Sequence, residues 1–215
     1  MALPLPLRIR QAAFLLALQR PWHQVTLEAI AREADVSLTE LRKITSSRAA
    51  ILSGFSRDID ESMLANLAKQ PPSGEPHDRL FDVILRRLEI MGPYREVVAS
   101  IIRSPAGDPG EALDLFSAAS RSAVWMLAAA GAEADFHWRS INKLSLHHAY
   151  WRVVQVWIED DDPGLAKTMA TLDRRLRDAE ARAETLRSFG HLAGNARRMV
   201  AAFWNRNRDQ PTGEP

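Results

Sequence analysis

Hydrophobic residues recur along this chain at the three- and four-residue spacing of α-helices, and strand-like alternation is sustained nowhere. The widest apolar face begins at residue 144 and combines two parallel rows: Leu144, Trp151, Val154 and Ile158, with Leu146, Tyr150, Val153 and Trp157. Three aspartates end this stretch, and Asp162-Pro163-Gly164 predicts a sharp reversal of the chain. A second helix follows, so we expect an antiparallel helix pair that forms either the core of a domain or half of a dimer interface.

Four shorter patterns occupy the first 70 residues. Helices are predicted over residues 7–19, from Thr26, from Ser37 and over residues 48–69. Thr26 can accept a hydrogen bond from a free N–H at the start of its helix, and Ser37 with Glu40 fits a capping box. Two short helices separated by a tight turn predict a helix-turn-helix.

The middle of the chain predicts three more helices, over residues 80–90, 94–103 and 111–130. A Pro- and Gly-rich loop over residues 70–76 precedes them and is the best subdomain boundary. The last of the three carries the core row that we expect to be buried: Leu113, Phe116, Ala119, Val124 and Leu127. We interpret Asp160-Asp161-Asp162 as a solvated helix end, because the alternating ligand spacing of a calcium loop is missing.

Composition narrows the functional classes. The chain has 215 residues, of which 46% are hydrophobic and 26% are charged, as in an ordinary globular protein. It has no cysteine, which excludes disulfides and cysteine-ligated zinc and fits a cytoplasmic protein. We expect no transmembrane segment, because no apolar run approaches about 20 residues. We also find no motif for phosphate binding, nucleophilic catalysis or metal binding, so we predict a protein that is not an enzyme and holds no metal.

Residues 8–55 resemble the N-terminal domain of TetR-family regulators. The shared positions are Thr26, Ile30-Ala31, Val36-Ser37, Leu41 and Ser47-Arg48. The family usually has Gly where Asp35 stands, since the turn needs a left-handed residue, and it commonly has aromatic residues where Arg42 and Thr45 stand. The resemblance implies an all-α, TetR-like fold with a helix-turn-helix and a helical ligand-binding and dimerisation domain.

DNA contacts would come from Arg42 and Lys43 on the helix that enters a major groove, and from Arg48 at a phosphate. Residues 1–60 hold eight Lys and Arg against six Asp and Glu, a thin excess for binding driven by phosphate contacts. The alternatives are a DNA-binding unit and a helix-turn-helix kept as a scaffold.

TetR-like C-terminal domains commonly enclose an apolar cavity, and large Met and aromatic side chains suit such a pocket for a hydrophobic ligand. The alternative for each residue is ordinary core packing. The candidate pocket residues are Met91, Tyr94, Phe116, Trp125, Met126, Trp151, Trp157 and Met169.

A second resemblance lies in the C-terminal half. The ordered runs Asp135-Phe136-His137-Trp138, Asp162-Pro163 and Leu172-Asp173-Arg174-Arg175 resemble the lipid-binding accessory proteins of ubiquinone biosynthesis, the ninth member of the Coq set. After Trp138, Arg139 stands where that family tends to have Tyr. The resemblance implies no cofactor, a bound isoprenoid, quinone-like molecule or phospholipid, and a partner enzyme that contacts Asp135, Phe136 and Trp138.

The tail predicts a basic amphipathic helix. Its apolar face carries Phe189, Leu192, Val200, Phe203 and Trp204. Such a helix is typical of membrane surfaces, and it is equally typical of a terminal helix docked on the core or on a partner. The accessory-protein resemblance favours peripheral membrane contact.

Together these observations predict three parts: a helix-turn-helix subdomain over residues 1–70, a ligand and dimer domain over residues 71–187, and an amphipathic tail over residues 188–215. We expect a homodimer whose helices of residues 135–160 and 165–186 pair with their symmetry mates as a four-helix bundle. The first functional hypothesis is a lipid-binding accessory protein. The second is a TetR-type repressor with a hydrophobic effector. The third is a homodimeric interaction protein that binds neither ligand nor DNA.

Overall fold

The computed structural model describes residues 3–104, 109–132 and 143–181, and every regular element in these ranges is helical, which confirms the all-α prediction. The elements are α1 (Leu5–Gln19), the 3₁₀ turn η1 (Trp22–Gln24), α2 (Leu27–Glu33), α3 (Leu38–Ile44), α4 (Arg48–Lys69), α5 (Pro76–Met91), the 3₁₀ turn η2 (Gly92–Tyr94), α6 (Arg95–Arg103), α7 (Pro109–Ala129) and α8 (Lys143–Trp157). Residues 166–181 form a further helix.

Side-chain caps begin α2 and α3 where the sequence predicted them, and a further cap begins α4. The hydroxyl of Thr26 accepts a backbone N–H from the first turn of α2, and Ser47 caps α4 in the same way. At α3, Ser37 Oγ accepts from the Glu40 N–H at 3.2 Å while Glu40 Oε2 accepts from the Ser37 N–H at 2.8 Å, the expected capping box. Asp35 lies in the turn between α2 and α3 with a φ of 52°, the left-handed conformation that the turn requires.

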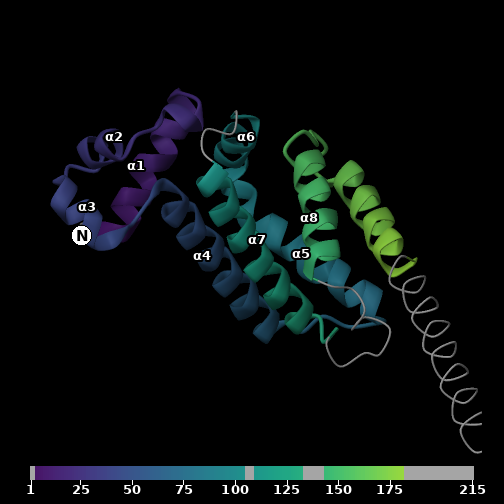
Figure 1. The fold of residues 1–215 in the computed structure, drawn as a ribbon. Coiled ribbons are helices and arrows are strands. Elements are labelled where there is room, and N and C mark those ends of the chain that lie inside the picture. The colour runs from purple at the N-terminus through teal and green to yellow at the C-terminus, as the bar shows by residue number, and fades with distance from the viewer. Residues whose placement is uncertain (1–2, 105–108, 133–142, 182–215) are drawn as a thin grey trace, which may run out of the picture.

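The helices form an elongated molecule with α1, α2 and α3 at one end (Figure 1). Helix α4 leaves this end and packs against α5 and α7, while α8 packs against α5 and α7 and is followed by the helix of residues 166–181. One hydrophobic cluster runs through the described chain from Ile9 in α1 to Ala179. The position of the helix-turn-helix is therefore tied to the packing of the remaining helices.

Helix α7 buries a different face from the predicted one. Leu113 is 64% exposed, Phe116 is 42% exposed and Val124 is only partly buried, so most of the expected core row was wrong. The buried face consists mainly of small side chains: Ala118, Ser122, Ala123, Met126 and Leu127. Large apolar residues also lie on the exposed side of α7, so helical spacing alone did not identify the side that packs against α4.

The connection after α8 is built by two carboxylates. Asp160 was expected to be solvated, but it is fully buried, and its Oδ2 accepts from the backbone N–H and the hydroxyl of Thr168 at 2.8 and 2.7 Å. Burial opposes ionisation of Asp160, yet the hydrogen bonds from Thr168 hold its pKa below the usual value. Asp162, which is exposed, accepts from the N–H groups of Gly164 and Ala166. These bonds define the reversal that Pro163 and Gly164 predicted.

Candidate functional site

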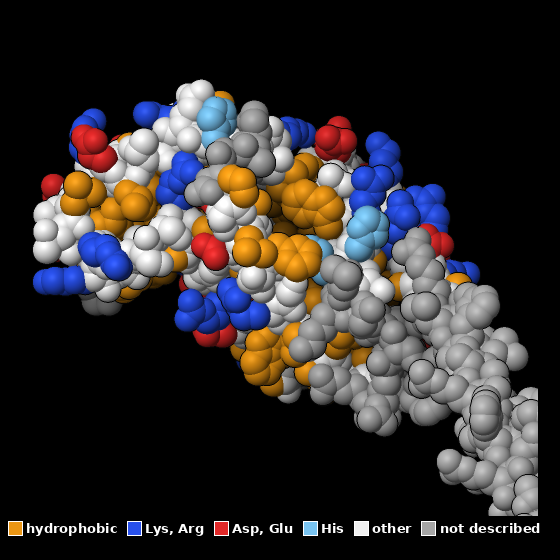
Figure 2. Space-filling view, viewed as in Figure 1, with side chains coloured by type: hydrophobic (Ala, Val, Ile, Leu, Met, Phe, Trp, Pro, Cys, Tyr) orange, Lys and Arg blue, Asp and Glu red, His pale blue; other side chains and the backbone are white. Residues whose placement is uncertain are grey.

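An apolar cavity of about 560 Å³ lies among α1, α4, α5, α6, α7 and α8. Its size is in the range of ligand pockets for small molecules. The larger apolar side chains of its lining come from six helices and η1: Phe14, Trp22, Leu52, Phe55, Met91, Val97, Val98, Ile101, Ile102, Leu115, Phe116, Trp151 and Val154. Figure 2 shows hydrophobic and histidine side chains gathered on the face formed by α7 and α8.

Three of the eight predicted pocket residues line this cavity. Met91 ends α5, Phe116 lies on α7, and Trp151 lies on α8. Phe116 and Trp151 are each 42% exposed, so they form part of the cavity's rim toward solvent.

The other five predicted pocket residues do not line the cavity. Tyr94 packs edge-on against aromatic rings of α1 and α4, behind the cavity wall. Met126 and Trp157 are buried in the core, Trp125 is 53% exposed on the outside of α7, and Met169 lies on the helix of residues 166–181. Helical spacing identified these residues as apolar, but their direction depends on which neighbour each helix packs against.

The sequence interpretation missed the aliphatic wall from α6 and the polar residues of the cavity. The polar lining consists of His23, Ser56, Arg87, Ser104, Glu111, His147 and Tyr150. One signal was available for Arg87, because it occupies a core position between Ile84, Leu88 and Met91 at helical spacing. A charged residue at such a position indicates a buried, paired group.

Arg87 is the centre of a buried polar network at the cavity. Its Nε donates to Asp60 Oδ1 at 2.8 Å, and Ser122 donates to Asp60 Oδ2 at 2.6 Å. The five N–H groups of the guanidinium have five acceptors: Asp60, Met91, Tyr150, Ser56 and Ser122. Burial raises the pKa of Tyr150, so its hydroxyl stays protonated. The charge of Arg87 is therefore neutralised within the protein.

A second polar cluster joins the N-terminal helices to α7. Arg48 Nη2 donates to Glu111 Oε2 at 2.6 Å, and its Nη1 donates to the carbonyl oxygens of Trp22, His23 and Val25. Trp22 Nε1 donates to the other carboxylate oxygen of Glu111 at 3.1 Å. The side chain of Arg48 is 19% exposed. The sequence analysis predicted that Arg48 contacts a DNA phosphate. In the structure its guanidinium faces η1 and α7 and donates to these internal acceptors.

The exposed side of α3 carries the remaining candidate DNA contacts. Arg42 and Lys43 of α3 are exposed, and their neighbour Leu41 is buried. Arg8 of α1 donates to the carbonyl oxygens of Ala34 and Asp35 and so holds the turn before α3. Figure 2 shows Lys and Arg side chains at the end of the molecule that α1 to α3 form. This arrangement presents two cations on a capped, anchored helix.

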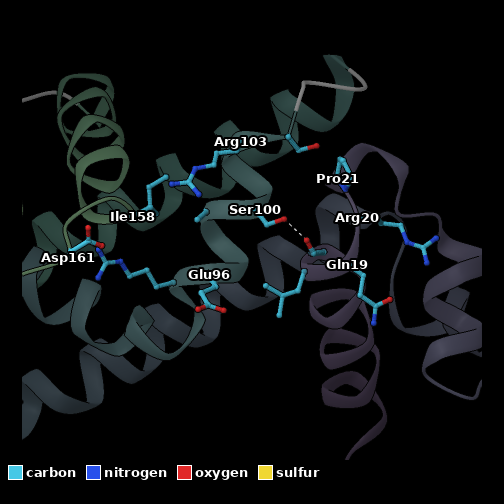
Figure 3. A pocket seen from close by; sticks show the side chains of 13 residues that line it. Gln19, Arg20, Pro21, Glu96, Ser100, Arg103, Ile158 and Asp161 are labelled. Carbon is cyan, nitrogen blue, oxygen red and sulfur yellow. Dashed lines mark hydrogen bonds between the residues drawn. The ribbon is translucent and has the colours of Figure 1, made fainter. Parts of the chain in front are cut away.

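A wider groove of about 740 Å³ lies between α1, α6 and the end of α8 (Figure 3). Ser100 of α6 points toward α1 and donates to the carbonyl oxygen of Ala17. The groove mixes charges of both signs, including Arg20, Arg103 and Glu96. Its lining also includes Ala17, Leu18, Ala99 and Ile158, so apolar and charged side chains are mixed in the groove between α1 and α6.

Several predicted features lie outside the described residues. These are the partner surface, with Asp135, Phe136 and Trp138, and the apolar face of the tail, with Phe189, Leu192, Val200, Phe203 and Trp204. Among the described residues, no group of His, Asp and Glu could hold a metal ion. No helix in the same ranges has the length and hydropathy needed to cross a membrane.

Comparison with known proteins places the fold. No protein-family model matches the chain, and no curated protein does. The structure is similar to a TetR transcriptional regulator from Nitrosomonas europaea ATCC 19718, with a TM-score of 0.63 and 22% identity over 82% of this chain and 98% of that one. It is also similar to a TetR transcriptional regulator from Rhodococcus sp. RHA1, with a TM-score of 0.59 and 19% identity over 80% of this chain and 93% of that one. The TetR-like fold is thereby confirmed, while these findings lend no support to the ubiquinone-accessory resemblance.

Proposed function

We propose that this protein is a DNA-binding transcriptional regulator whose DNA affinity responds to a hydrophobic small molecule. The observation that carries the proposal is the path of α4. This helix begins directly after the helix-turn-helix and then lines the apolar cavity with Leu52, Phe55 and Ser56. A ligand that moves α4 would therefore change the position of α3.

In this proposal α3 enters the major groove, with Arg42 and Lys43 at the DNA. The protein acts as a homodimer through α8 and the helix that follows, so its two α3 helices read the two halves of a palindrome. The capping box of Ser37 and Glu40 supports this use of α3, because a seven-residue helix is marginal without caps.

In this proposal Glu111 links the cavity to the N-terminal helices that contact DNA. Its side chain lines the cavity and also accepts hydrogen bonds from Arg48 and Trp22. Arg48 is the first residue of α4. A ligand that contacts Glu111 or changes its position would alter the contact that holds α4 and η1 to α7.

The test starts from selection of binding sites from fragmented genomic DNA by the full-length protein. Fluorescence anisotropy then gives Kd for a selected site at several salt concentrations. We expect the Arg42→Ala, Lys43→Ala double variant to bind at least about tenfold more weakly and to reduce the salt slope by about 2, one counterion for each lost phosphate or base contact.

The matched control is Arg57→Ala with Lys69→Ala, which removes two exposed cations from α4, away from α3. This control should bind DNA like the parent protein. A selection that enriches no sequence, or equal affinities for the α3 double variant and the parent, would contradict the proposal.

A lipid-binding accessory protein of ubiquinone biosynthesis is the second candidate. It is favoured by the apolar cavity and by the run from Asp135 to Trp138, which resembles the partner surface of that family. Native mass spectrometry with lipid analysis of an organic extract tests it. A stoichiometric isoprenoid or phospholipid, with no DNA site enriched, would favour this function.

Two further features belong to the second candidate. The partner contact predicts that Trp138→Ala loses a quinone-biosynthesis hydroxylase in a pull-down. The membrane contact predicts that removal of residues 188–215 abolishes flotation with anionic liposomes. If Trp138→Ala still binds the hydroxylase and the protein without residues 188–215 still floats with the liposomes, this function is contradicted.

A further inference from the structure

The charged groups that line the apolar cavity are paired with partners inside the protein. Arg87 is paired with Asp60 and uses all five of its N–H groups. Glu111 is paired with Arg48 at 2.6 Å. An ion that entered the cavity would lose its hydration and find no free charge of opposite sign among the described lining residues, which makes its binding unfavourable.

One polar side chain of the lining is different. The Nδ1 atom of His147 is buried and has no hydrogen-bond partner among the described residues. The imidazole ring lies against Phe116, with ring centroids 4.4 Å apart, so its position is held by packing. His147, Tyr150, Trp151 and Val154 share the face of α8 that lines the cavity.

His147 is neutral at physiological pH. Burial, followed by the nearby His148, lowers its pKa below the ordinary value. A neutral imidazole has one nitrogen that donates and one that accepts a hydrogen bond. The tautomer decides which nitrogen has which role. Because His147 lines the cavity, its imidazole offers a hydrogen-bonding group to a bound molecule there.

We propose that the cavity selects a neutral, elongated apolar compound with one hydroxyl or carbonyl group, which hydrogen-bonds the imidazole of His147, over the carboxylate of the same chain length. The apolar part of the compound then packs along the aliphatic side chains of α6, including Val98, Ile101 and Ile102. This inference rests on the proposed function only in treating the cavity as a ligand site.

The experiment is a titration of the full-length protein at pH 7.5 with 1-decanol, 2-decanone and decanoate. Displacement of N-phenyl-1-naphthylamine, an apolar fluorophore, reports binding of each probe. We expect 1-decanol and 2-decanone to bind at least about tenfold more tightly than decanoate, because the carboxylate must be desolvated without a counter-ion.

Variants of one residue test the role of His147. His147→Phe keeps a ring against Phe116 but removes the hydrogen bond, so it should weaken 1-decanol binding by about three- to tenfold and leave decanoate unchanged. His147→Gln, which retains a donor and an acceptor, should recover most of the loss. His148→Gln changes the exposed neighbour and should bind like the parent.

Equal affinity for decanoate and 1-decanol, or unchanged 1-decanol binding in both His147 variants, would overturn the inference. Absence of displacement by every probe would overturn it as well. The DNA selection contains no ligand and so judges the proposed function independently. A protein that binds DNA but does not prefer 1-decanol over decanoate would refute this inference and leave the proposed function standing. A protein that shows the ligand preference but selects no DNA sequence would refute the proposed function and leave this inference standing.

Discussion

Arg48 and Glu111 are 63 residues apart in the sequence and form an ion pair with an N–O distance of 2.6 Å. The pair joins the first residue of α4 to the first turn of α7, and Glu111 also accepts from the indole N–H of Trp22. This single carboxylate therefore connects three elements around one end of the apolar cavity.

Glu111→Gln should lower the free energy of unfolding by about 1–3 kcal/mol, because Arg48 keeps its charge in a poorly exposed site and loses its counter-ion. Urea denaturation followed by circular dichroism measures the change. Glu28→Gln is the matched control, since it breaks an ion pair with Arg32 in which both side chains are at least 70% exposed. The control should cost less than about 0.5 kcal/mol, and equal costs for the two variants would contradict the role of Glu111.

The ion pair of Asp60 and Arg87 predicts that substitutions of these two residues have strongly non-additive effects on the free energy of unfolding. Arg87→Met should destabilise the protein by about 3–5 kcal/mol, because it leaves the Asp60 carboxylate buried without a counter-ion. The double variant Asp60→Leu, Arg87→Met should recover a large part of that loss. A double-mutant cycle from urea denaturation measures the coupling, and additive effects of the two substitutions would show that the pair does not act as a unit.

The left-handed conformation of Asp35 predicts a stabilising substitution. Asp35→Gly should raise the free energy of unfolding by roughly 0.5 kcal/mol, since Gly adopts a positive φ without steric cost. Asp35→Ala should lower it, because Ala has the same Cβ and no polar side chain to form local hydrogen bonds. Thermal unfolding of both variants is the measurement, and a fall in Tm for Asp35→Gly would argue against this account of the turn.

Asp160 predicts a defined pH dependence. Hydrogen bonds from Thr168 hold its folded-state pKa below the ordinary value of 3.8, although burial acts in the opposite direction. Its contribution to stability is therefore complete above the unfolded-state pKa and is lost as the pH falls through the folded-state pKa. The gap in unfolding free energy between the parent protein and Asp160→Asn should be largest at neutral pH and shrink as the pH falls below about 4.

Urea denaturation between neutral and acidic pH measures this gap. Asp161→Asn is the control, because Asp161 is the exposed neighbour of Asp160 and its substitution should change stability little. A gap between the parent and Asp160→Asn that does not narrow in acid would show that the hydrogen bonds from Thr168 do not favour the ionised form.

The sequence by itself determined the helical class and the position of the helix-turn-helix. Helix α4 spans the predicted residues 48–69, and Thr26, Ser37 and Ser47 cap the helices that they were expected to begin or precede. These features depend on neighbours three or four residues away, so the local sequence contains nearly all of the interactions that produce them.

Only the tertiary structure decided which way the longer helices face and which charges are free. Trp125 and Met126 are adjacent and both nonpolar, yet one is 53% exposed and the other is buried, because the contact of α7 with α4 chooses the buried face. Arg48 and Asp160 were both expected to meet solvent or DNA, and each instead binds groups brought to it by the fold. Their partners depend on packing between helices, which the periodicity of a single helix does not encode.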